Sequence, residues 1–139
     1  GKTNTYHTPE QDLFEPMLSA DQRKEMLASG IEFGSHTQHH VHLTGCSPNE
    51  LREEIAGSRQ DLEALLGRPA FSFCYPYGDQ DDRVRQAVVD SGYESACSTL
   101  KGGNHRGGDP YRLRRINIRA DTLLPVFLFK LARARWFNR

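Results

Sequence analysis

Two histidines four residues apart, His36 and His40, are the residues of this sequence whose type and spacing most clearly allow chemistry. On a helical turn, side chains at positions i and i+4 point the same way, so both imidazoles could reach one point. Neutral imidazole nitrogens are good ligands for a borderline divalent metal such as zinc. The pair therefore indicates a partial metal site, and the alternative is a histidine-rich loop that binds no ion.

The two histidines follow directly after a short segment, 31–34, that predicts a strand. Residues 76–78, Pro-Tyr-Gly, end a second predicted strand, 71–75, which is rich in aromatic residues. A third predicted strand, 93–98, leads into residues 99–104. Parallel strands share a carboxyl edge, where ligands gather in open sheets and in barrels. We therefore expect the segments after the three strands to meet at one site.

Helix start and stop signals surround these strands. Ser19 with Gln22, and Ser47 with Glu50, have the spacing of capping boxes, and Gly67 is placed to end the second helix. The predicted elements, in order, are helix 20–29, strand 31–34, helix 48–66, strand 71–75, helix 82–91, strand 93–98, loop 101–110, strand 113–118 and a final helix that opens at Asp121 or Thr122. Strands that alternate with helices predict parallel pairing with right-handed crossovers.

Length and composition fit one α/β domain over residues 1–139. An apolar fraction of 37% and a charged fraction of 26% are ordinary for a globular protein. No uninterrupted apolar run reaches the roughly 18 residues that a membrane-spanning helix needs, so no transmembrane segment is expected. The three cysteines, Cys46, Cys74 and Cys97, form no C-x-x-C pair, which argues against a zinc knuckle and against a disulfide framework.

The net charge is zero but unevenly distributed. Residues 1–105 carry 9 Lys/Arg and 16 Asp/Glu, a balance of −7, whereas residues 106–139 carry 9 Lys/Arg and 2 Asp/Glu, a balance of +7. The basic end is either a solvated face that pairs with the acidic remainder, or a surface for nucleic acid or an anionic membrane. The arginines available for such a surface are Arg112, Arg114, Arg115, Arg119, Arg133 and Arg135. Since no stacking aromatics are interleaved with them, we expect no nucleic-acid partner.

Two stretches of the sequence resemble motifs of the polysaccharide deacetylases, carbohydrate esterase family 4. Residues 34–40, Gly-Ser-His-Thr-Gln-His-His, followed by Leu43 and a helix capped by Ser47, resemble the second motif of that family. Residues 73–78, Phe-Cys-Tyr-Pro-Tyr-Gly, resemble the third motif, and residues 93–118 resemble the later half of the domain. The resemblance implies a parallel-stranded, distorted (β/α) barrel.

The resemblance also implies a reaction. The family holds a divalent metal, most often Zn²⁺ and in some cases Co²⁺ or Ni²⁺, with two histidines and one aspartate, and His36 and His40 match the histidine ligands. The metal activates water to attack an N-acetyl or O-acetyl group on an amino sugar or polysaccharide. By the same resemblance, the backbone N–H of Tyr77 stabilises the oxyanion, and Pro76 contributes to substrate binding by fixing the turn.

Several family features have no match here. No Asp-Asp pair, the family's source of the general base and the third ligand, precedes His36; the only adjacent pair is Asp81-Asp82, downstream. The chain therefore resembles the carboxyl-terminal two-thirds of the domain, an incomplete barrel. Cys74 stands where many members have an arginine, and the late histidine that acts as general acid is missing, with His105 as a possible substitute.

Two functional interpretations remain open at the level of sequence. The first is a metal-dependent carbohydrate deacetylase, a hydrolase of linear amides, whose activity in this chain is low because a positioned base contributes roughly 10²–10⁴-fold. The second is a non-catalytic relative that binds a glycan or a partner. An incomplete barrel exposes strand edges, which predicts self-association. The sequence gives no indication of the cellular compartment, the oligomeric state or the particular sugar.

Overall fold

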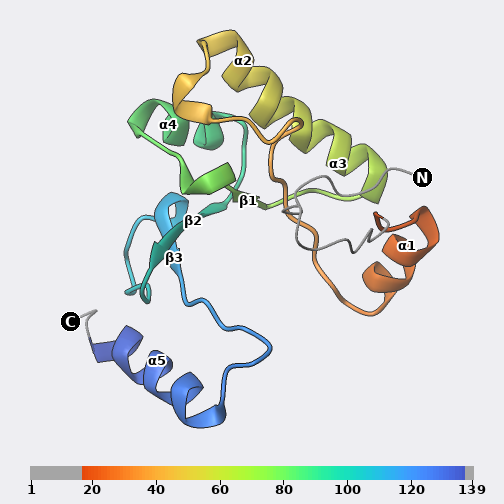
Figure 1. Ribbon diagram of the computed structural model, residues 1–139. Coiled ribbons are helices and arrows are strands. Elements are labelled where there is room, and N and C mark those ends of the chain that lie inside the picture. Colours follow the sequence, from red (N-terminus) through yellow and green to blue (C-terminus); the bar gives the residue numbers. More distant parts are fainter. Residues whose placement is uncertain (1–16, 137–139) are drawn as a thin grey trace, which may run out of the picture. The chain divides into compact units, whose positions relative to one another are not determined.

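The computed structural model describes residues 17–136, and the side chains of residues 17–134 (Figure 1). The chain forms two compact units, Gly1–Glu32 and Phe33–Arg139. The first unit contains helix α1, Ala20–Ala28. The side chain of Ser19 accepts a hydrogen bond from the backbone N–H of Gln22, and the Gln22 side chain accepts one from the Ser19 backbone. The predicted capping box is therefore confirmed.

The second unit is built on three parallel strands, β1 (Ser72–Cys74), β2 (Ser95–Lys101) and β3 (Leu113–Arg115), in the order β1-β2-β3 (Figure 1). In the register of the sheet, Cys74 lies beside Cys97, and Cys97 lies beside Leu113. The predicted parallel pairing is confirmed. Strand β2 begins two residues later than predicted and continues to Lys101, which the sequence had placed in a loop.

The strand predicted over 31–34 is wrong, because that segment has no regular secondary structure. The pairing with β1 begins only at Ser35, whose N–H donates to Ser72 O at 2.9 Å and whose carbonyl accepts from Cys74 N at 2.9 Å. Thr37, with φ of 67°, then turns the chain out of the extended conformation. The pairing is therefore limited to a single bridge, immediately before His36.

The helix predicted over 48–66 is confirmed, with one irregularity. It consists of α2 (Pro48–Arg52), a π-helical turn (Glu53–Gly57) and α3 (Ser58–Leu66), and it ends at Gly67 in the left-handed conformation, φ 65°. Nothing in the sequence pattern predicted the π turn. Such turns occur mostly as single insertions in α-helices and often at functional sites.

Helix α4, Asp82–Asp90, packs its apolar face into the core. Asp81 caps it by accepting a hydrogen bond from Val84 N at 2.7 Å, and Val84 and Val88 are fully buried. The core joins this face to α2, to the π turn and to the strands, and consists of Leu43, Leu51, Ile55, Phe73, Tyr75, Val84, Val88, Tyr93 and Ala96. The interpretation of Phe73 and Tyr75 as core residues rather than a substrate platform is thus confirmed.

Helix α5, Leu124–Trp136, follows β3 after an irregular connection (Figure 1). The predicted final helix is confirmed, but many of its apolar side chains are exposed, among them Leu124 at 67% and Phe129 at 65%. The side chains of Arg135 and Trp136 lie outside the described residues. No helix in the described part of the chain has the length and apolar character to cross a membrane. Self-association and a single partial domain over 1–139 stay predictions.

Candidate active site

The histidine loop, residues 36–40, is anchored by the carboxylate of Glu54 in the π turn. This carboxylate accepts hydrogen bonds from Gln38 N at 3.0 Å, His39 N at 2.9 Å and His39 Nδ1 at 2.7 Å. Burial opposes ionisation of Glu54, whose exposure is 8%, but these hydrogen bonds outweigh burial and hold its pKa below the usual value. An ionised carboxylate therefore fixes the loop to the helix.

The backbone of the histidine loop is strained. Thr37 and His40 have φ values of 67° and 55°, in the left-handed region that residues other than glycine rarely adopt. The Thr37 hydroxyl oxygen accepts a hydrogen bond from His40 N at 2.9 Å, which closes the turn. The two histidines therefore do not lie on a helical turn, and the reasoning from i,i+4 helical spacing is corrected. Strain of this kind collects at functional sites.

This strained turn nevertheless brings the two predicted imidazoles together. The ring centroids of His36 and His40 lie 4.8 Å apart, at an interplanar angle of 73°. His36 Nδ1 lies 2.6 Å from the carbonyl oxygen of Cys74. Because a carbonyl oxygen can only accept, Nδ1 carries the hydrogen and donates a hydrogen bond to it. A hydrogen bond of this kind leaves Nε2 as the nitrogen with a lone pair, which is the usual arrangement of a metal-binding histidine.

Tyr77 lies beside the imidazole pair, in the turn Pro76–Gly78 that follows β1. Its ring centroid is 4.7 Å from that of His40, and it stacks on His42 at 4.1 Å with an interplanar angle of 11°. Tyr77 also has positive φ, 58°, and is 54% exposed. Pro76, at the start of this turn, is fully buried.

The Tyr77 turn is held against strand β2. The hydroxyl of Thr99 donates to Tyr77 O at 3.2 Å. Gly78, with φ of 73°, packs so closely that a Cβ there would lie 2.1 Å from Thr99 Oγ1 and 2.7 Å from Thr99 N. The structure thus brings together the histidine loop, the Tyr77 turn and Thr99. Asn104, at the far end of the third predicted segment, instead bonds to the backbone of Arg114.

Comparison with known proteins identifies the family. A model described as "Polysaccharide deacetylase" matches residues 3–96. The chain belongs to the polysaccharide deacetylase family. Among proteins, it is similar to YxkH of Bacillus subtilis (strain 168), provisionally named as a polysaccharide deacetylase, with 29% identity over 101 residues, which are 73% of this chain and 36% of that protein.

Solved structures of the family share its fold. The Streptococcus pyogenes deacetylase PplD, in complex with acetate, matches with a TM-score of 0.76 and 26% identity, over 81% of this chain and 50% of that one. BC0361, a polysaccharide deacetylase from Bacillus cereus, matches with a TM-score of 0.76 and 30% identity, over 86% of this chain and 38% of that one. The predicted deacetylase-type fold is confirmed, and the chain spans half or less of these relatives' length.

In the described part of the chain, the candidate site of this polysaccharide deacetylase fold presents two imidazoles. Within residues 17–136, no group of three or more His, Cys, Asp or Glu side chains is placed to hold a metal ion. Asp79 accepts hydrogen bonds from the N–H and hydroxyl of Thr44, and the exposed Asp82 pairs with Arg112. His105 lies 3.4 Å from the carbonyl of Arg106 in its own loop.

Sequence reasoning missed one functional candidate, Glu54. A signal for it does exist in the helical pattern. Leu51, Ile55 and Ser58 mark the buried face, and Glu54 lies three residues after Leu51 and therefore on that same face. A carboxylate in an apolar stripe requires hydrogen-bond donors, and it finds them in the histidine loop.

Proposed function

We propose that this chain forms part of a hydrolase that removes N-acetyl or O-acetyl groups from an amino sugar or polysaccharide, with a divalent metal. Membership of the polysaccharide deacetylase family supports acetyl hydrolysis. One observation carries the proposal, namely that the His36 and His40 rings lie 4.8 Å apart beside the Tyr77 turn. The relative PplD was solved with acetate, which is the product that such a reaction releases.

His36 and His40 fit a metal of the zinc type. The hydrogen bond from His36 Nδ1 to Cys74 O fixes the ring and leaves Nε2 as the ligand atom. Zn²⁺ favours imidazole ligands, as Co²⁺ and Ni²⁺ also do. When bound, such an ion supplies Lewis acidity, which makes water acidic near neutral pH and polarises a carbonyl. The described residues contain no group of three or more side chains that could complete the coordination, so the remaining ligands would come from outside them.

The chain's own residues would orient the reacting groups. The backbone N–H of Tyr77 would donate to the oxyanion that forms when the acetyl carbonyl is attacked. Pro76 and Gly78 fix the turn that carries this N–H, and the stacked His42 ring restrains the Tyr77 side chain. Glu54 keeps the histidine loop in position for the same site.

Zinc binding and acetate release test the proposal together. The chain is titrated with Zn²⁺ by calorimetry and then incubated with a chitooligosaccharide, with a chelator-treated sample as the control. We expect binding that involves both imidazoles, and acetate release that the chelator abolishes. Absence of Zn²⁺ binding by the intact chain would contradict the proposal.

A second candidate, a non-catalytic relative that binds a glycan, is favoured by one observation. The described residues offer no carboxylate cluster beside the imidazole pair to act as the base. Binding of chitooligosaccharide without any acetate release, in the presence of saturating Zn²⁺, would favour this candidate over the hydrolase.

A further inference from the structure

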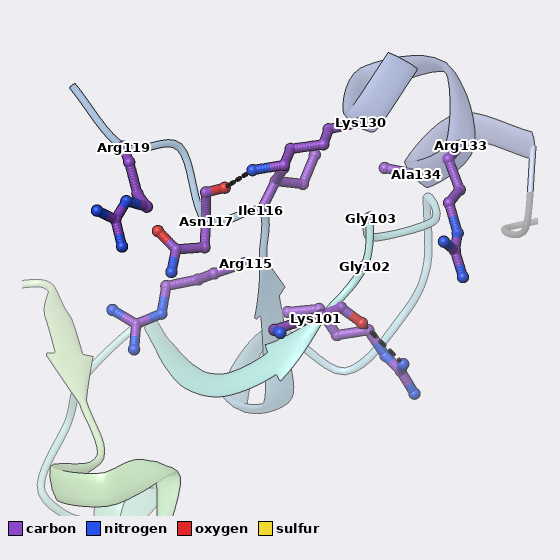
Figure 2. Close-up of a pocket in the computed structure, with 11 residues that line it drawn as sticks. Lys101, Gly102, Gly103, Arg115, Ile116, Asn117, Arg119, Lys130, Arg133 and Ala134 are labelled. Carbon is purple, nitrogen blue, oxygen red and sulfur yellow. Dashed lines mark hydrogen bonds between the residues drawn. The ribbon is translucent and has the colours of Figure 1, made fainter. Parts of the chain in front are cut away.

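A pocket of about 670 Å³ lies between the end of β2, the end of β3 and helix α5 (Figure 2). We call it the basic pocket, and its cationic lining residues are Lys101, Arg114, Arg115, Arg119, Lys130 and Arg133. None of its described lining residues is acidic or aromatic. Its volume lies in the range of pockets that hold small ligands.

Neutral carbonyl groups hold several of these cationic side chains. Arg115 Nε donates to Ser98 O at 2.7 Å, and Lys130 Nζ donates to Asn117 O at 2.8 Å, a contact drawn in Figure 2. A carbonyl oxygen positions a cationic group without neutralising its charge. The side chains of Arg115 and Lys130 are therefore held in place and keep their positive charge.

Some arginines elsewhere in the same unit are paired with carboxylates, and Arg83 donates to the carbonyl oxygens of Cys46 and Thr44. Arg59 pairs with Glu63 at 2.9 Å, and Arg85 pairs with Asp109 at 2.6 Å. In the basic pocket, Arg119 pairs with the exposed Asp121. Like charges concentrated in a cleft raise the local concentration of anions and are stabilised by binding them.

Strand β2 connects the basic pocket to the candidate active site. Thr99 contacts the Tyr77 turn, and Lys101, two residues further along the strand, lines the basic pocket. Two residues of a parallel strand span roughly 7 Å. An extended polymer chain could therefore run from the Tyr77 turn along β2 and place a charged unit in the basic pocket.

We propose that the basic pocket binds carboxylate or phosphate groups of the polymer, so that the substrate is an acidic acetylated polysaccharide. This inference rests on the proposed deacetylase function for the identity of the ligand, but not for the existence of the anion site. Nucleic acid fits the pocket less well, because single strands are usually bound on stacking aromatics and the described lining contains none.

Two matched oligosaccharides test this inference. Hyaluronan and chitin oligosaccharides of equal length both contain N-acetylglucosamine, but only hyaluronan alternates it with a carboxylate sugar. We expect calorimetry to show tighter binding of hyaluronan, weakening between 50 and 200 mM NaCl. Equal affinity for the two, or affinity independent of salt, would overturn the inference. Competition by N-acetylglucosamine 6-phosphate and by glucuronate would tell whether phosphate or carboxylate is preferred.

Substitutions locate the binding. Lys101→Gln combined with Arg114→Gln is expected to lower hyaluronan affinity by about tenfold, the combined effect of two exposed charge pairs. Lys101→Arg should retain the affinity, and Arg52→Gln, an exposed arginine on α2, is the matched control. An equal loss with Arg52→Gln, or no loss with the double substitution, would contradict the inference.

Binding measurements also distinguish anion binding from hydrolysis, and a polysaccharide ligand from nucleic acid or a membrane. Binding is measured without metal, and acetate release is measured separately with saturating Zn²⁺. Hyaluronan binding through the basic pocket in the first assay, with no acetate release in the second, would support the anion site while the proposed hydrolase function fails. A DNA oligonucleotide, or vesicles containing phosphatidylglycerol, that bind more tightly than hyaluronan through Lys101 and Arg114 would overturn the assignment to a polysaccharide.

Discussion

The histidine loop and the basic pocket, which the Tyr77 turn and β2 connect, are built in opposite ways. In the histidine loop, hydrogen bonds converge on the carboxylate of Glu54, rings contact rings, and the backbone is held in strained conformations. In the basic pocket, the cationic side chains of Arg115 and Lys130 donate hydrogen bonds to neutral carbonyl oxygens. The first region fixes geometry, and the second concentrates cationic side chains.

The difference indicates a division of labour. A reacting centre requires ligands and hydrogen-bond donors at set positions, which the strained loop and the Tyr77 turn provide. A site for an anionic polymer requires positive charge on groups that can adjust, which lysine and arginine side chains provide. Substitutions in one region should therefore leave the function of the other intact, and four predictions test this comparison.

The largest effect is expected from removing the imidazoles. The double substitution His36→Ala, His40→Ala should lower Zn²⁺ affinity by more than about 100-fold, since even loss of an outer-shell partner of a metal site can cost that much. Calorimetry with Zn²⁺ measures it, and His105→Ala, in a separate loop, is the control. Hyaluronan binding should be unchanged. Zn²⁺ affinity that survives the double substitution would place the metal elsewhere.

Removal of the Glu54 carboxylate should have the next largest effect, on the free energy of unfolding. Glu54→Ala leaves the N–H groups of Gln38 and His39 without their charged acceptor, so we expect a loss of about 2–3 kcal/mol in the free energy of unfolding. Denaturant unfolding measures this loss, and Glu53→Gln, an exposed carboxylate in the same turn, is the control. Weaker Zn²⁺ binding should accompany the loss of stability. Unchanged Zn²⁺ affinity would show that the histidine loop does not depend on its anchor.

These two predictions also show what the sequence could and could not reveal. Helix α4 was predictable because Val84 and Val88 recur at helical spacing and both are buried. The absence of a strand at 31–34 was not predictable, because the pairing of Ser35 depends on where β1 lies, which local pattern does not encode. Periodicity is local, whereas strand pairing is a long-range contact.

The candidate site shows the same limit. The residue types and spacing of His36 and His40 correctly predicted that the two rings lie close together. The predicted backbone was wrong, because left-handed conformations at Thr37 and His40 replace the expected helical turn. Left-handed backbone at residues other than glycine has no reliable sequence signal, because the surrounding structure imposes it. The π turn that positions Glu54 was missed for the same reason.

A smaller effect is expected at the junction between the two regions. Gly78→Ala would place a methyl group against the backbone of Thr99 and force an unfavourable φ, at a cost of about 1–2 kcal/mol. The Tyr77 turn would then move away from β2, so acetate release should fall more than Zn²⁺ affinity. Gly45→Ala, where a Cβ would meet nothing within 4 Å, is the control. Equal effects of the two substitutions on acetate release would remove the Tyr77 turn from the proposed site.

The smallest effect is expected from Asp109, whose pairing with Arg85 contrasts with the hydrogen bond of Arg115 in the basic pocket to a neutral carbonyl. The Arg85 guanidinium, helped by the N–H of Tyr111 and opposed by partial burial, holds the pKa of Asp109 below 3.8. Because the folded-state pKa is lowered, the stabilisation is fully present above pH 3.8 and is lost as the pH falls through the folded-state value. Asp109→Asn should therefore lower Tm at pH 7 by no more than about 2–4 °C, since both side chains are nearly a third exposed.

That difference in Tm should vanish in strong acid, where the wild-type carboxyl is also protonated, and thermal melts across this pH range measure it. Asp121→Asn is the matched control, because it removes the carboxylate beside Arg119 of the basic pocket, where both partners are at least 70% exposed. It should leave Tm unchanged but tighten hyaluronan binding, because the pocket then gains net positive charge. A carboxylate thus stabilises the fold where it pairs with Arg85 and opposes ligand binding where it pairs with Arg119. If both substitutions changed Tm equally and neither changed hyaluronan binding, the distinction between a structural arginine and a ligand-binding one would fail.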